Sequence, residues 1–325
     1  MRALLLLLTT GLMLSGGPTA AAPAGSPWGA GYFPNVTLVN QDGKPLRFYD
    51  DVIKDKVVLI NFIFVGCGNA CPLETANLRK VQEALGDRVG RDIFMYSISI
   101  DPEHDTPVAL KEYAEKFKAG PGWQFLTGKA EDITLLRKKL GLYREGEARA
   151  DHTASLIVGN EATGQWRKRS AFDNPKVLAA VLGDDLFNYR RANTSRKSYA
   201  DAPRIKHVDP GEDLFRRRCQ ACHTIGAGDT VGPDLRGVVA KRDRAWLSRW
   251  LKEPDQMLAE KDPTAMDLYA RYKQVQMPNL KLSDSEVQLL IGYMETASRP
   301  AGEVKQPGPK DEVDPRASPT AVPRR

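Results

Sequence analysis

The sequence predicts two domains, an α/β domain built on a buried sheet and a smaller all-α domain behind it. Two short and almost wholly apolar runs, 57–64 and 93–100, have the pattern of strands buried on both faces, and a helical pattern follows each. Residues 188–210 are rich in Arg, Lys, Ser, Ala and Pro and lack apolar periodicity, which is typical of a linker. The chain of 325 residues is long enough for two domains with their own cores.

Both ends of the chain are expected to lie outside these domains. Residues 1–22 place Arg2, an apolar run of about 12 residues and then small residues in the order of a secretory signal peptide. Because about 20 residues are needed to span a bilayer, we expect cleavage, with an uncleaved anchor as the alternative. The mature protein is then exported, most simply into a bacterial periplasm. Residues 299–325 have almost nothing to bury and are expected to be a disordered tail.

The first domain, residues 28–187, alternates strands and helices along the chain. Besides the two buried strands, the patterns predict strands at 123–126, 153–158 and 164–170, and helices at 72–85, 108–117, 133–140 and 174–186. The turn residues 159–161 make the last two strands a hairpin. This alternation predicts an α/β sandwich around a central sheet.

Cys67 and Cys71 lie between the first buried strand and its helix, which is the arrangement of the thioredoxin-like fold. A thiol at a helix N-terminus is near the positive end of the helix dipole, which lowers its pKa. Residues four apart share one helix face, so the two sulfurs could bind one metal ion or close a disulfide. The residues Gly66, Gly68 and Asn69 favour a loop here over a pair of buried cysteines that act as small hydrophobes.

Three motifs, in order and at the expected spacing, resemble the Sco copper-chaperone family. They are FVGCGNACP at 64–72, SIDPEHDTP at 99–107 and DHT at 151–153. The resemblance covers residues 28–186. It departs from the family pattern at 68–70, which lacks the acidic residue often found between the two cysteines.

This resemblance implies that the thioredoxin-like domain binds copper through Cys67, Cys71 and His152. It also implies a role in metallating the binuclear copper centre of cytochrome oxidase. The donor chemistry agrees, because two thiolates suit Cu(I) and an imidazole is accepted by both Cu(I) and Cu(II). The alternative for His152 is a surface histidine before a strand. Among the four histidines, His104 is a weaker ligand candidate in a loop that Asp101 and Asp105 are expected to shape.

The second domain, residues 211–298, carries Cys219 and Cys222 directly followed by His223, the spacing that attaches a c-type haem. The two thiols would form thioethers with the haem vinyl groups, and His223 is placed to ligate the iron. A helix is expected at 212–222.

The residues that follow support this assignment. The segment GPDLRG at 232–237, a helix at 246–251, QMPNL at 276–280 and a capped helix to Glu295 resemble, in this order, class I cytochromes c. The resemblance implies Met277 as the second axial ligand of the iron. Ligation by His and Met raises the haem potential and leaves no open site at the iron.

Two other methionines compete with Met277 on chemistry alone. Met257 lies in a helix-like stretch where core filling is the default, and Met266 lacks the proline and the capped helix that follow Met277. Trp246 and Trp250 are expected in the core rather than against the haem.

These observations predict an exported copper-binding redox protein with a fused haem for one-electron transfer. One alternative is a thiol–disulfide oxidoreductase that acts through Cys67 and Cys71 on oxidase-subunit thiols or other exported thiols. A disulfide takes two electrons whereas haem and copper each transfer one, and no proline lies between 121 and 175 to act as the cis-proline of thioredoxin-type reductases. The other alternative is a plain electron-carrier cytochrome with a docking domain.

The expected partners are the copper-site subunit of cytochrome c oxidase and a redox protein. The net charge of +6 includes the cluster Arg216–Arg218, which fits a solvated face or a docking patch for an acidic redox partner. No nucleic-acid partner is expected of an exported chain, and contact with a membrane is expected only through the partner. The linker, flexible and basic, is expected to bring the two domains together without a rigid interface.

Overall fold

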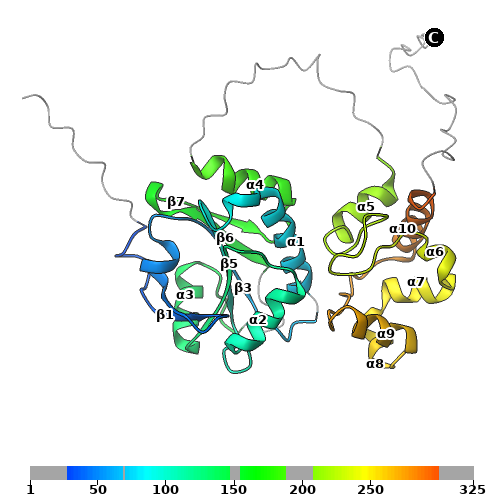
Figure 1. The fold of residues 1–325 in the computed structure, drawn as a ribbon, viewed down its shortest axis with the longest axis horizontal. Coiled ribbons are helices and arrows are strands. Elements are labelled where there is room, and N and C mark those ends of the chain that lie inside the picture. The colour runs from blue at the N-terminus through cyan, green and yellow to red at the C-terminus, as the bar shows by residue number, and fades with distance from the viewer. Residues whose placement is uncertain (1–27, 69, 147–153, 188–207, 300–325) are drawn as a thin grey trace, which may run out of the picture.

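The computed structural model describes residues 28–68, 70–146, 154–187 and 208–299. The predicted signal segment, the predicted tail beyond residue 299, residues 188–207 of the linker and His152 lie outside the described residues. Figure 1 shows two lobes side by side, a sheet lobe (residues 28–187) and a helical lobe (residues 208–299). Within these described ranges, no helix is both long enough and apolar enough to cross a membrane.

The described strands form one sheet in the order β2-β1-β5-β4-β3-β6-β7. They are β1 (Thr37–Asn40), β2 (Pro45–Arg47), β3 (Val57–Ile63), β4 (Ile93–Ser99), β5 (Trp123–Gly128), β6 (Ser155–Asn160) and β7 (Gln165–Ser170). The three central strands β5, β4 and β3 are parallel, and the outer strands pair antiparallel. The hairpin predicted for the last two strands is confirmed as β6 and β7.

Helices cover both faces of this sheet. They are η1 (Phe48–Ile53), α1 (Ala70–Leu85), α2 (Pro107–Lys116), α3 (Ala130–Lys139) and α4 (Pro175–Gly183). All seven residues of β3 are buried, as the apolar run predicted, and they alternate between two cores. Leu59 and Ile63 join the core under α1, α2 and α4, whereas Val58 and Ile60 join the core under η1 and α3. The lobe has the predicted thioredoxin-like α/β fold.

Two local features of the sheet lobe differ from the sequence expectation. Strands β1 and β2 were not predicted, because strands of three or four residues are too short to show a period. Helix α1 begins at Ala70 instead of residue 72, and it buries Glu74 and Thr75 while Leu73 stays half-exposed.

The helical lobe has six helices within the described residues. They are α5 (Pro210–Arg218), α6 (Val238–Lys241), α7 (Arg244–Lys252), α8 (Pro254–Ala259), α9 (Pro263–Arg271) and α10 (Asp284–Ala297). Of these, α5, α6, α7 and α10 pack around a separate core. The capping box at the start of α10 is confirmed by bonds between Ser283 and Glu286. The predicted helix at 212–222 is wrong at its end, because α5 stops at Arg218 and the haem-type cysteines follow it in turns.

Candidate metal and haem centres

The cysteine loop, residues 64–72, runs from the end of β3 into the first turn of α1 and holds both thiols of the sheet lobe. The backbone N–H of Cys67 donates to the Phe64 carbonyl oxygen at 3.2 Å, which turns the chain back after the strand. The backbone N–H of Cys71, in the first turn of α1, donates to the Cys67 Sγ at 3.4 Å. Cys67 is 8% exposed and Cys71 is fully buried. The helix N-terminus therefore favours negative charge on the Cys67 sulfur, as the sequence predicted for a thiol in this place.

Cys71 has the opposite tendency. Its hydrogen bond with Cys67, and then its burial, raise the pKa of the Cys71 thiol well above the ordinary value. A metal ion must therefore displace a proton from this site, and binding weakens as the pH falls. Two sulfurs one helical turn apart, one favoured as thiolate, form a donor set that fits a soft ion such as Cu(I).

Glu74 is a site residue that was not predicted from the sequence. It is 1% exposed on the buried face of α1, and its Oε1 has no hydrogen-bond partner within the described ranges. Burial, and then the proximity of Cys67, raise the pKa of Glu74 to about 8. The available signal was spacing, since Glu74 stands three residues after Cys71 and four before the buried Leu78.

The loop after β4 supports the cysteine loop, because β3 and β4 are parallel and end at the same edge of the sheet. The buried Asp105 carboxylate accepts the backbone N–H of Val65 at 3.0 Å and the hydroxyl of Ser99 at 2.6 Å. Asp105 was expected to shape its own loop through side-chain-to-backbone bonds, but the backbone group that its carboxylate binds belongs to the cysteine loop. The bonds also fix the cysteine loop to the neighbouring strand end.

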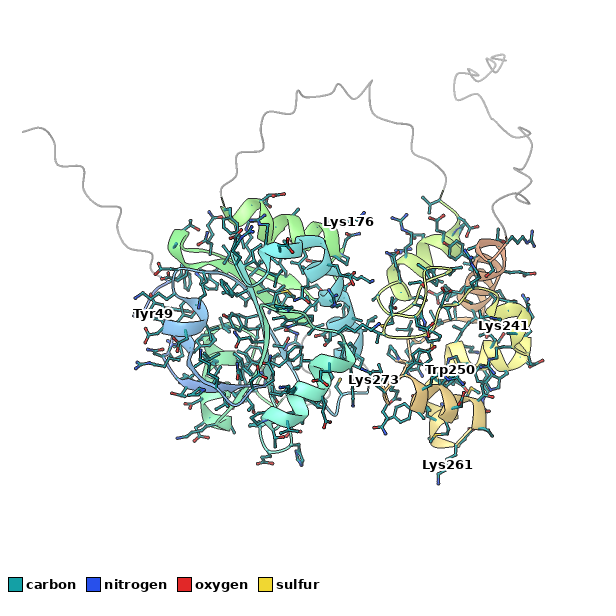
Figure 2. All side chains as sticks on the ribbon, in the orientation of Figure 1. Tyr49, Lys176, Lys241, Trp250, Lys261 and Lys273 are labelled. Carbon is teal, nitrogen blue, oxygen red and sulfur yellow. The ribbon has the colours of Figure 1, made fainter. Side chains whose placement is uncertain are left out.

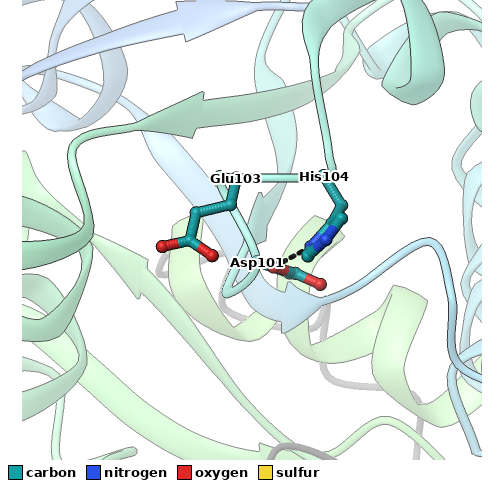
Figure 3. A group of neighbouring side chains, drawn as sticks. All are labelled: Asp101, Glu103 and His104. Carbon is teal, nitrogen blue, oxygen red and sulfur yellow. Dashed lines mark hydrogen bonds and ion pairs between the residues drawn. The ribbon is translucent and has the colours of Figure 1, made fainter.

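Figure 3 shows Asp101, Glu103 and His104 in the same loop. The Nδ1 atom of His104 lies 2.9 Å from Oδ1 of Asp101, and the His104 side chain is 72% exposed. Asp101 was expected to act through its side chain, but it shapes the loop through its backbone: its N–H donates to Ser99 Oγ at 2.9 Å, and its carbonyl accepts from the N–H of Asp105. His104 thus serves the conformation of the loop.

The helical lobe holds a cavity of about 310 Å³, and Cys219, Cys222 and His223 line it. The Nδ1–H of His223 donates to the Pro233 carbonyl oxygen at 2.9 Å, which leaves Nε2 as the ligand atom. Burial lowers the pKa of His223 and so favours the neutral imidazole that binds iron. Two thiols, an oriented imidazole and an apolar cavity fit a covalently attached haem.

Met277 lines the same cavity and packs against the core of the helical lobe. Of its rivals, Met257 is 1% exposed in α8, in the predicted role of core filler, and Met266 is 40% exposed. Trp246 packs against the core of the helical lobe, as expected, and both Trp246 and Trp250 are half-buried and also line the cavity (Figure 2 labels Trp250). A large indole ring is seldom buried completely. The Nε1–H of Trp246 donates to the Asp262 carboxylate.

Cationic side chains at the rim complete the fit to a haem. Arg236, Lys241 and Arg242 line the cavity. Their charges suit the two carboxylates that a haem carries.

One wall of this cavity comes from the other lobe. Pro72, the residue after Cys71, lines it together with the haem-type cysteines. Val231 of the helical lobe belongs to the same buried apolar cluster as α1. The two lobes are thus in packed contact, where the linker composition had predicted no fixed interface.

The fold and the two centres define a two-domain redox protein, in which a thioredoxin-like domain with a buried dithiol precedes a helical haem-binding domain. A family model described as SCO1/SenC matches residues 30–183, and one described as Cytochrome c matches residues 208–298. The chain belongs to the SCO1/SenC family and carries a cytochrome c domain after the family domain. The cytochrome c domain implies covalent haem c as a cofactor.

Several curated proteins are similar to the sheet lobe. The SCO1 protein homolog of Bacillus subtilis is 34% identical over 128 residues, which are 38% of this chain and 65% of that protein. A putative copper-binding protein of Stutzerimonas stutzeri is 29% identical over 47% of this chain and 78% of its own length. The SCO2-like protein RC0895 of Rickettsia conorii is 34% identical over 46% of this chain and 74% of its own length.

Solved structures match the same region. The structure of Bradyrhizobium japonicum ScoI with copper bound is 28% identical and covers 47% of this chain and 96% of its own, with a TM-score of 0.39. A SCO1/SenC family lipoprotein from Bacillus anthracis is 29% identical and covers 45% of this chain and 90% of its own, also with a TM-score of 0.39.

Proposed function

We propose that the protein binds one copper ion through Cys67, Cys71 and His152. The observation that carries this proposal is the pair of buried cysteines where β3 leads into α1. The backbone N–H of Cys71 donates to the Cys67 sulfur at 3.4 Å. Two thiolates satisfy Cu(I), and an imidazole supplied by His152 adds a ligand suited to Cu(II). His152 lies outside the described residues, so its part in the ligand set rests on the sequence motif.

The haem is proposed to set the oxidation state of this copper. Thioethers from Cys219 and Cys222 hold the haem, and His223 and Met277 ligate its iron. With both axial positions filled, a haem supplies one-electron transfer and no chemistry at an open iron site. Cu(II) reduction to Cu(I) takes one electron, so the two centres match in electron count. The position of Pro72, between Cys71 and the haem cavity, supports a short path for that electron.

The biological role proposed is delivery of copper to the copper-site subunit of a cytochrome c oxidase, outside the cytoplasm. One relative of solved structure, BsSco, is described as a member of the Sco family of cytochrome c oxidase assembly proteins. The first 22 residues of this chain have the order of a signal peptide, which supports export. Oxidation and reduction of the dithiol, with an exported thiol protein as substrate, is the competing function.

Copper titration of the haem-loaded full chain tests the ligand set. Cys67→Ala or Cys71→Ala should abolish binding, because one thiolate and one imidazole leave Cu(I) under-coordinated. His152→Ala should weaken Cu(II) more than Cu(I), since two thiolates alone can hold Cu(I). His104→Ala, the matched histidine control, should leave both affinities unchanged.

The outcome assigns the site. Loss of Cu(II) affinity in His104→Ala but not in His152→Ala would show that the wrong histidine was chosen. Full retention of dithiol reactivity towards protein disulfides together with no copper binding would favour the oxidoreductase.

A further inference from the structure

We propose that the haem-cavity rim of the helical lobe is a removable cap over the cysteine loop. In the closed arrangement the helical lobe covers the loop that holds Cys67 and Cys71, and a copper-accepting protein must displace it. This inference rests on the proposed copper function but adds a surface, its occupant and a consequence for access.

The first support is an apolar contact between the lobes. Val231 is 8% exposed, and it shares a buried cluster with Cys67, Cys71 and the residues of α1. Ala221 and Val275, also of the helical lobe, pack against that cluster from its edge. A buried valine between two lobes needs apolar neighbours on both sides, so this contact is a packed interface.

The second support is the close approach at Gly68. A Cβ atom built on Gly68 would lie 2.9 Å from Oε1 of Gln276, closer than real Cβ atoms come to other atoms. Gly68 stands between the two cysteines, where the acidic residue common in the family is missing. In the closed arrangement the end of the Gln276 side chain occupies the space beside position 68.

A charge interaction also crosses the interface. Lys118 of the sheet lobe acts on Asp229 of the helical lobe, whose pKa is lowered by the N–H of Asp234, by Tyr272 and, more weakly, by this lysine. A cation of the sheet lobe therefore faces an acidic side chain of the helical lobe. Lys273, labelled in Figure 2, marks the side of the helical lobe that faces the sheet lobe.

A cap in this place has a direct consequence for copper transfer. A protein that takes copper from the loop must approach its sulfurs, and the helical lobe occupies that approach. The 20 residues from 188 to 207 join the lobes covalently and keep the cap at a high effective concentration. Opening therefore costs free energy that a copper acceptor must supply through its own contacts.

Alkylation of the haem-loaded, copper-free full chain with iodoacetamide tests the cap. Cys219 and Cys222 are thioethers in this form, so Cys67 and Cys71 are the reactive thiols among the four cysteines. Ala221→Arg places a charge in the interface and should raise the alkylation rate about tenfold if the closed state dominates by about ten to one. Gln220→Arg, the same change at the exposed neighbouring position, should leave the rate unchanged.

Small-angle scattering supplies a second measurement that does not depend on thiol chemistry. Ala221→Arg should enlarge the radius of gyration of the full chain, because its charge would have to be buried in the closed interface. Gln220→Arg should not, because residue 220 is exposed. The haem spectrum of each variant reports that the helical lobe is folded.

If Ala221→Arg matches Gln220→Arg in either measurement, the cap is wrong. No arm contains copper, so these results stand apart from the copper titration. If these measurements show that the lobes of the unmodified protein are not closed but the protein binds copper, only the cap is wrong. If they show closed lobes but the protein binds no copper, only the proposed function is wrong.

Discussion

At each of the two centres, a hydrogen bond with a backbone group helps to set the tautomer or the ionisation of a side chain. The Nδ1–H of His223 donates to the Pro233 carbonyl oxygen, which fixes the ring and its tautomer. The N–H of Cys71 donates to the Cys67 sulfur, so two adjacent thiols acquire different tendencies to ionise. One partner in each bond is a backbone group, the Pro233 carbonyl or the Cys71 N–H. Because a turn or the start of a helix holds this backbone group, small side-chain movements do not displace it.

The choice of Met277 as iron ligand can be tested by spectroscopy. Met277→Ala should abolish the weak absorption band that a Met-to-iron bond gives at the red end of the spectrum, because the methionine sulfur is lost. Met266→Ala, the exposed counterpart, should retain the band. Retention in Met277→Ala would show that another group ligates the iron.

The acid stability of the helical lobe should depend on Asp234. Burial opposes ionisation of this carboxyl group, but the backbone N–H groups of Gly226, Arg236 and Gly228 outweigh it and lower the pKa of Asp234 to about 2. The unfolded value is about 3.9, so the carboxylate stabilises the fold above that pH. The stabilisation is then lost as the pH falls from about 4 towards 2.

Acid unfolding followed by haem absorbance checks this expectation. Asp234→Asn should flatten the fall in the free energy of unfolding between about pH 4 and pH 2, since an amide does not titrate there. Asp267→Asn, which removes an exposed partner of Arg271, should keep the wild-type slope. An identical slope in both variants would contradict the role of Asp234.

At the scale of elements, the crossing of α5 and α10 holds the helical lobe together. The ring centroids of Phe215 and Tyr293 lie 5.5 Å apart at this crossing. Gly211 permits the approach, because a Cβ on it would lie 2.3 Å from the Leu289 carbonyl oxygen and 2.8 Å from Tyr293 Cβ. The turns that carry Cys219 and Cys222 follow α5 directly, so this crossing also positions the haem attachment.

A pair of glycine substitutions tests the crossing. Gly211→Ala should lower the free energy of unfolding by about 1–3 kcal/mol, because the backbone of α10 cannot yield as a flexible side chain would. Gly292→Ala, on the open side of α10 with nothing within 4 Å of the added Cβ, should raise it by about 0.5–1 kcal/mol. Thermal unfolding that gives both variants the same sign would contradict the close approach.

At the scale of the whole molecule, the haem cavity is adjacent to the start of α1, where the cysteine loop lies. Pro72 lines the cavity and directly follows Cys71, so the chain itself connects the two centres. For the electron transfer proposed above, the distance between the centres would be set by folding and not by diffusion. The proposal therefore offers a reason for fusing the two domains in one chain.

Intramolecular transfer has a kinetic signature. When Cu(II) is added to protein with reduced haem, haem oxidation should follow first-order kinetics at a rate independent of protein concentration. Cleavage at a protease site introduced into residues 188–207 should make the reaction slower and concentration-dependent, because the effective concentration of the tethered lobe is lost. If Cu(II) leaves the haem reduced, or Cys67→Ala reacts equally fast, the plain electron-carrier function is favoured.

The sequence alone determined the fold class, both cysteine motifs and most strands and helices. These features depend on residues within a few positions of one another, such as the buried run of β3 or the spacing of Cys219, Cys222 and His223, so local patterns suffice to specify them. Short strands and the end of α5 escaped prediction, because three or four residues carry too little periodicity. The burial of Glu74 was also not predicted. Which residues of α1 face the core depends on where the helix begins, and the sequence placed that start two residues too late.

Only the tertiary structure decided which surfaces meet. Gly68 and Gln276 are far apart in the chain, as are Pro72 and His223, and no periodicity in either segment records the partner. Such contacts depend on the shapes and charges of two finished lobes, which exist only after each core has formed. The sequence therefore determined the two centres, and the packing of Val231 against the α1 core decided that they share one interface.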